Sequence, residues 1–114
     1  MNFIKLGNHK IEVSVSMGSR MIKQSDTKKL LELKDSETSE HFIDAEFVTD
    51  TLFKKIYESK NATKEQEIIF NGLCMVGIYS LIDEVCKVDL RGVSYIKEFN
   101  SQITSKIIEI KPQN

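Results

Sequence analysis

The residues best suited to acid-base or metal chemistry lie around His41, with Glu40 beside it and Asp44 three residues on. Residues three apart share one face of a helix, and an imidazole among carboxylates can hold a metal ion or activate water. A single imidazole is still a weaker pattern than His-x-x-x-His or Cys-x-x-Cys, which supply two strong ligands together. We therefore expect no metal site and no cofactor. Any hydrolase-type activity would depend on His41.

The two cysteines, Cys74 and Cys86, stand twelve residues apart in what the pattern predicts to be one helix. Twelve residues span about 18 Å of helix, whereas a disulfide joins Cα atoms about 4.4–6.8 Å apart. We expect two free thiols buried among apolar residues, where a thiol is a poor nucleophile. Free thiols, with no secretory signal in residues 1–7, indicate a cytoplasmic protein.

Phosphate chemistry has no glycine-rich loop to support it, since neither the P-loop pattern nor G-x-G-x-x-G occurs. What remains is a basic first third, in which residues 1–34 carry seven Lys or Arg against three acids. Residues 35–46 then carry five acids and no base, so the two segments could instead pair with each other. The net charge of −1 and the lack of interleaved aromatic residues argue against nucleic acid. The candidate phosphate-binding residues are Lys5, Lys10, Arg20, Lys23, Lys28 and Arg91.

The element that would hold these groups together is a central helix from Ile68 to Ile82, fifteen residues without Asp, Glu, Lys or Arg. It directly follows Thr63-Lys64-Glu65-Gln66, which has the form of a capping box. The run is shorter than the ~20 apolar residues of a membrane span, so we expect no membrane association. Its glycines allow close backbone approach, either to the sheet or to a second copy at a dimer axis. The candidate oligomer-interface residues are Gly72, Met75, Gly77, Tyr79, Phe99 and Ile103.

The N-terminal part has the pattern of a β-sheet, because apolar and polar residues alternate from Ile11 to Met17. The alternation predicts a strand with one buried face, on which Met17 lies, and one face in water. Gly7 and Asn8 predict a tight turn before this strand, so that residues 2–17 form a hairpin. A lone hairpin is marginally stable in water. A third strand is therefore expected, either at residues 30–33 or at residues 107–110.

Helical spacing of apolar residues runs from Asp44 to Tyr57 and again from Val93 to Ile107. In the first of these helices Phe53 and Tyr57 belong to the apolar side, which is expected to face the core. The pattern predicts a single α+β domain over residues 1–114, β-rich over 1–34, with an acidic loop over 35–43 and a helical part over 44–110. Its N-terminal antiparallel hairpin or small three-stranded sheet packs on a C-terminal bundle of about three helices.

The missing catalytic patterns favour a non-enzymatic binding protein that acts as a homo-oligomer and meets a macromolecular partner, with protein favoured over nucleic acid. A composition rich in Lys, Glu, Ile and Asn favours an inhibitor, an adaptor or an assembly accessory protein of the mobile-element type. The alternative is a nucleotide-ligand or nucleic-acid binding protein that uses the basic N-terminal third.

Overall fold

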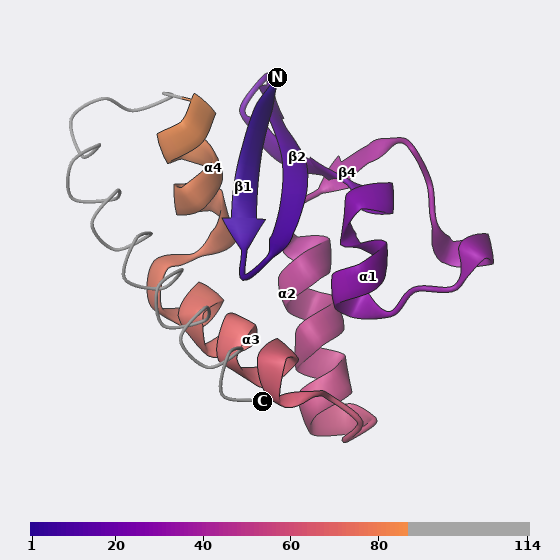
Figure 1. Ribbon diagram of the computed structural model, residues 1–114. Helices are drawn as coiled ribbons and strands as arrows, with labels where there is room; N and C mark the ends of the chain where they lie inside the picture. Colours follow the sequence, from indigo (N-terminus) through magenta and orange to yellow (C-terminus); the bar gives the residue numbers. More distant parts are fainter. Residues whose placement is uncertain (87–114) are drawn as a thin grey trace.

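The computed structural model describes residues 1–86 of the 114-residue chain. An antiparallel sheet of four strands in the order β1-β2-β3-β4 forms its N-terminal part (Figure 1). The expected third helix, the alternative strand at 107–110, and the candidate residues Arg91, Phe99 and Ile103 lie outside the described residues. The strands are β1 Asn2–Leu6, β2 His9–Ser16, β3 Ser19–Lys23 and β4 Phe42–Asp44.

Two-residue turns join the first three strands. Gly7 opens the first turn with φ of +65°, and Met17 and Gly18 form the second with φ of +51° and +82°. The two successive positive φ values of the second turn match a type I′ turn, whose twist suits neighbouring strands. The predicted hairpin is confirmed by the antiparallel pairing of β1 with β2 across the first turn. The expected burial of Met17 is wrong, because its side chain stands fully exposed at the turn.

The third strand is β3, which follows the second turn directly, so the predicted position at residues 30–33 is wrong. Leu30 and Leu31 lie instead in the short helix α1 Lys28–Leu31 and are both fully buried. Adjacent residues of a strand face opposite sides of a sheet, whereas a helical turn can direct both toward one core. The stretch 35–43 contains the 3₁₀ turn Asp35–Glu37 and the start of β4.

The helical part begins with α2 Glu46–Phe53, which continues as the π-helical turn Lys54–Glu58. Next come α3 Lys64–Val76 and α4 Ile78–Cys86. The capping box at the start of α3 is confirmed, since Thr63 and Gln66 exchange hydrogen bonds of 2.9 and 3.1 Å.

The expected single central helix is wrong, because the chain breaks at Gly77. This residue has φ of +89° and ψ of 135°, which ends α3, and the axis of α4 is bent by 71° from that of α3. Among residues 1–86 no single helix is long and apolar enough to span a membrane; α3 and α4 pass that test by length and composition as a bent pair.

The core lies between the sheet and the helices. Helix α4 packs across β1, β2 and β3, and Figure 1 shows it beside the N-terminal end of β1. At the other end of β1, His9 after the first turn contacts Glu65 of α3 at 2.9 Å. Buried side chains come from every layer, including Ile4, Ile11, Ile22, Leu52, Ile69 and Ile82.

Candidate functional site

The basic residues expected to bind phosphate divide between two faces of the sheet. Register places Lys5 opposite Lys10 on the outer face, and Lys23 reaches Glu12 on the same face at 3.3 Å. Arg20 belongs to the other face and contacts α4, while Lys28 pairs with Asp35 beyond α1. Arg20, Lys23 and Lys28 each contact a carboxylate.

In two of these pairs a hydrogen bond shifts the pKa of one partner. The hydrogen bond from Lys23 to Glu12 raises the pKa of Lys23, and the hydrogen bond from Lys28 lowers the pKa of Asp35. Lys10 lies 4.3 Å above the centre of the Phe3 ring. Arg20, Lys23 and Lys28 already contact carboxylates, so their charges are less available to a phosphate. Lys5 and Lys10 remain as the adjacent basic pair of the predicted set.

A polar network joins the sheet to α4. Arg20 donates to both carboxylate oxygens of Asp83 at 2.8 Å, and its guanidinium lies 5.7 Å from the centre of the Tyr79 ring. Tyr79 Oη donates to Asp44 Oδ1 at 2.6 Å, which raises the pKa of Tyr79 to about 12 and lowers the pKa of Asp44. These contacts join β3, β4 and α4 through side chains.

His41, the candidate residue for acid-base chemistry, is not part of an assembled site in the described residues. His41 is exposed, and its backbone N–H donates to Ser39 Oγ at 3.1 Å. Within residues 1–86 no group of three His, Cys, Asp or Glu side chains gathers in a metal-binding arrangement.

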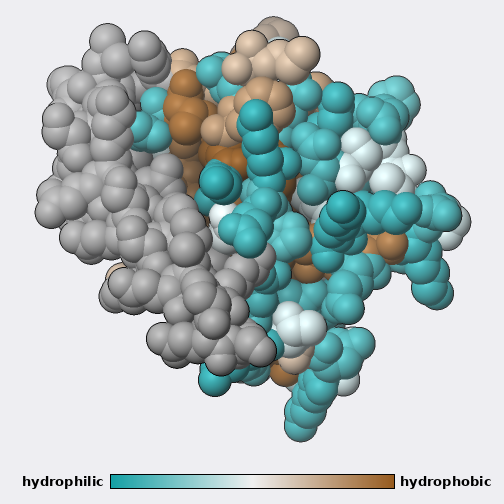
Figure 2. Space-filling model, in the orientation of Figure 1, coloured by the Kyte–Doolittle hydropathy of each residue, from teal (hydrophilic) through white to brown (hydrophobic). Residues whose placement is uncertain are grey.

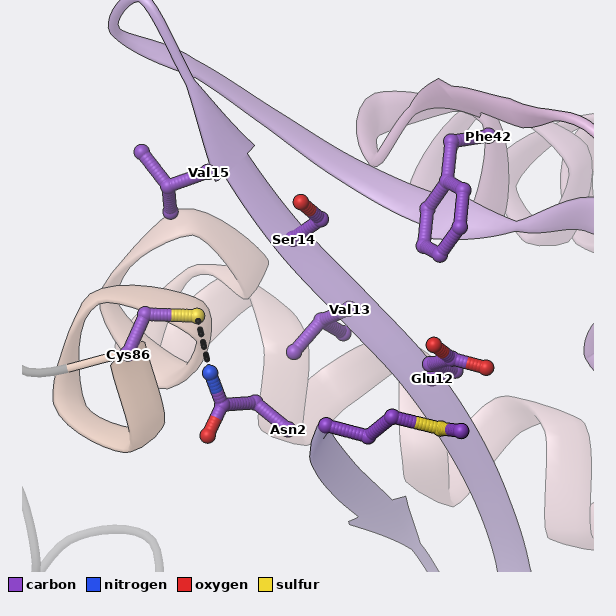
Figure 3. Close-up of a pocket in the computed structure, with 8 residues that line it drawn as sticks. Asn2, Glu12, Val13, Ser14, Val15, Phe42 and Cys86 are labelled. Carbon is purple, nitrogen blue, oxygen red and sulfur yellow. Dashed lines mark hydrogen bonds between the residues drawn. The ribbon is translucent and has the colours of Figure 1, made fainter.

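A pocket of about 500 Å³ lies beyond the start of β1, where β2 continues without a β1 partner (Figure 3). Figure 3 shows Cys86 and Asn2 on one side of β2, with Glu12 and Phe42 on the other. Asn2 Nδ2 donates to Cys86 Sγ at 3.5 Å. Burial raises the pKa of Cys86, so its thiol stays protonated and is a poor nucleophile. Cys74, expected to be buried, is exposed on α3.

The most distinctive surface is an aromatic cluster that we call the aromatic platform, formed by Phe53, Tyr57 and Phe70. The ring centres of Phe53 and Tyr57 are 4.9 Å apart, and both lie within 6.3 Å of the Phe70 centre. Phe70 is 7% exposed and anchors the cluster in the core, whereas Phe53 and Tyr57 are 47% and 56% exposed.

The sequence pattern placed Phe53 and Tyr57 on the buried side of their helix, and that assignment is wrong. Val48 and Leu52 are fully buried along one stripe, and Phe53 is one residue further, about 100° around the helix. The signal was therefore present: the apolar arc of this helix is wider than one buried face needs. The π-helical turn that carries Tyr57 is a rare element often found at functional sites.

The residues expected at an oligomer interface have different surroundings. Gly72 is buried, Gly77 forms the break between the helices, and Tyr79 is engaged with Asp44. Met75 is 67% exposed and so is available to a partner. The helical interface stays a prediction.

Comparison of the chain with protein-family models, with curated proteins and with solved structures finds no match in any of the three.

Proposed function

We propose that this protein is a non-enzymatic binding protein whose aromatic platform docks on a partner protein. The observation that carries the proposal is the exposure of Phe53 and Tyr57 while they stack on each other above the buried Phe70. Aromatic side chains dominate the energy of protein interfaces because they bury a large area at little entropic cost. Their anchoring also supports the proposal, since a preorganised surface loses little freedom on binding.

The surroundings of the platform favour a partner with an apolar groove and an acidic rim. Between positions 54 and 64 the chain carries four lysines and one acid, Glu58. Lys54, Lys60 and Lys64 are exposed, while Lys55 lies 3.7 Å from Glu32. A polar rim around aromatic anchors excludes water and steers a partner of opposite charge.

Such a protein would act as an inhibitor, an adaptor or an assembly accessory protein by covering a site on its partner. The link to mobile elements, which came from composition, stays a prediction. Phosphate binding by the basic N-terminal third has less support, because Arg20, Lys23 and Lys28 already contact carboxylates.

Affinity purification from the source cells tests the proposal, with the double variant Phe53→Ala/Tyr57→Ala compared to the wild type. Removing two interface anchors should cost about 2 kcal/mol or more, roughly a thirtyfold loss of affinity. Met17→Ala is the matched control, because it removes a fully exposed apolar side chain elsewhere on the surface.

We expect a protein that is enriched with the wild type and with Met17→Ala and lost with the double variant. Thermal unfolding of all three proteins checks that the fold persists. Equal enrichment with the wild type and the double variant would contradict the proposal.

A further inference from the structure

We propose that the outer edge of β1 pairs antiparallel with the same edge of a second copy, joining two four-stranded sheets into one. This interface differs from the helical one that the sequence pattern suggested. It is also independent of the aromatic platform, which lies on α2, the π-helical turn and α3.

The backbone geometry shows which groups of β1 are available. Leu6 and His9 flank a two-residue turn, so they form a hydrogen-bonded pair, and Ile4 with Ile11 and Asn2 with Val13 do the same. Alternate residues of a strand point their N–H and C=O groups to opposite edges. The groups of Phe3 and Lys5 therefore point away from β2.

This edge is open in the part of the chain that the structure describes. β1 is the last strand of the sheet on its side, and within residues 1–86 no backbone group bonds to its outer edge. Asn2 and Lys5 are exposed, and Phe3 is half-buried. No proline interrupts β1, and Lys5 is its single charged residue. Unpaired edges of this kind template strand addition.

Symmetry and charge select one register for the pairing. The two copies pair through the backbone groups of Phe3 and Lys5, which face outward in each copy. These groups meet only when the two-fold axis passes through Phe3, Ile4 or Lys5. An axis at Lys5 sets the two Lys5 side chains opposite each other, which is repulsive, and an axis at Phe3 leaves Leu6 beyond the overlap. An axis at Ile4 pairs all five residues of β1 and sets Phe3 opposite the partner's Lys5 on both sides of the axis.

The Phe3–Lys5 pairing repeats a contact that the chain already makes. Lys10, which is Lys5's neighbour across the sheet, lies 4.3 Å above the Phe3 ring. In the joined sheet each Phe3 ring also meets the partner's Lys5 ammonium, a favourable cation–π geometry. This match between the two residues is what favours a second copy over an unrelated strand.

The test uses Phe3→Lys, which separates the interface from the fold. Within one copy Lys at position 3 loses the contact with Lys10 but is opposite Glu12, an acidic neighbour on the same face. Between copies it sets two lysine pairs opposite each other and should weaken dimerisation about tenfold or more. The double variant Phe3→Lys/Lys5→Glu turns both pairs into Lys–Glu contacts and should restore the dimer.

Sedimentation equilibrium of the full chain gives the readout, with thermal unfolding to verify the fold. We expect the wild type at twice 13.1 kDa, Phe3→Lys shifted toward 13.1 kDa, and the double variant returned to the dimer. Amide exchange at Phe3 and Lys5 should slow as protein concentration rises, while Ile4 stays unchanged. A monomeric wild type, a dimer that Phe3→Lys leaves intact, or a double variant that does not recover would each overturn the proposal.

Discussion

The guanidinium of Arg20 and the carboxylate of Asp83, 63 residues apart, form two parallel hydrogen bonds of 2.8 Å between β3 and α4. The two side chains are 32% and 17% exposed, so water screens the pair less than it screens a fully exposed one. A bidentate arginine–carboxylate pair also fixes orientation. This contact joins α4 to the sheet, in addition to the apolar residues that α4 buries in the core.

Arg20→Lys should lower the thermal midpoint by a few degrees, because a lysine ammonium cannot reproduce the planar two-bond contact with Asp83. Lys28→Ala is the control: its partner Asp35 is 89% exposed, and surface pairs of this kind contribute little. Differential scanning calorimetry of the two variants measures the contrast. Equal midpoints for wild type and Arg20→Lys would show that the pair does not hold α4.

Tyr79→Phe should reduce the dependence of stability on pH at both extremes. The hydrogen bond from Tyr79 lowers the pKa of Asp44, so this stabilisation is present above the carboxyl's unfolded value and is lost as pH falls through its folded value. The pKa of Tyr79 is raised to about 12, so its contribution is present below about 10 and is lost as pH rises toward 12. Denaturant titrations between pH 2 and pH 5 follow the acid limb; identical slopes for the two proteins would count against the bond.

Gln66→Ala should cost about 1–3 kcal/mol of unfolding free energy. Gln66 is 2% exposed; it caps α3 through Thr63 and donates to the carbonyl of Leu30 at 2.8 Å, joining α3 to α1. Thr63→Ala removes the acceptor for the Gln66 N–H and leaves the donor from Gln66 to Leu30 in place, so it separates the two roles. Urea unfolding measures both variants. A cost below 0.5 kcal/mol, the size of an ordinary surface change, would argue against this linking role.

Cys74 should react with iodoacetamide at least about tenfold faster than Cys86 at pH 8, because thiolate fraction and access control the rate. Cys74 is exposed, whereas Cys86 is partly buried with a raised pKa. Peptide mass spectrometry over a time course gives both rates from one sample. Matching rates would contradict the burial of Cys86.

The sequence could predict the features that local chemistry determines. Alternation from Ile11 onward and the glycine turn define the hairpin, and Thr63 with Gln66 defines the start of α3, because each depends on neighbours within four residues. β4 escaped prediction because it has three residues, too few for a periodic signal. β3 escaped prediction because its five residues do not alternate cleanly between apolar and polar. Arg20, which α4 requires, interrupts the apolar pattern of β3.

The break at Gly77 had a visible signal, since glycine after a helical run is the commonest helix end. The long apolar run concealed it, because the same composition suits one helix or two. The aromatic platform could not be predicted, because Phe53 and Tyr57 fit the apolar pattern of a helix. Tertiary packing decides which apolar residues of such a pattern stay exposed to solvent.

Photo-crosslinking from position 57 of the full chain in its source cells tests the proposed function most directly. A benzophenone amino acid replaces Tyr57 in one sample and the fully exposed Met17 in a matched one. The account predicts a covalent adduct with one partner protein from position 57 and none from position 17. The absence of any adduct from position 57, or the same adducts from both positions, would contradict it.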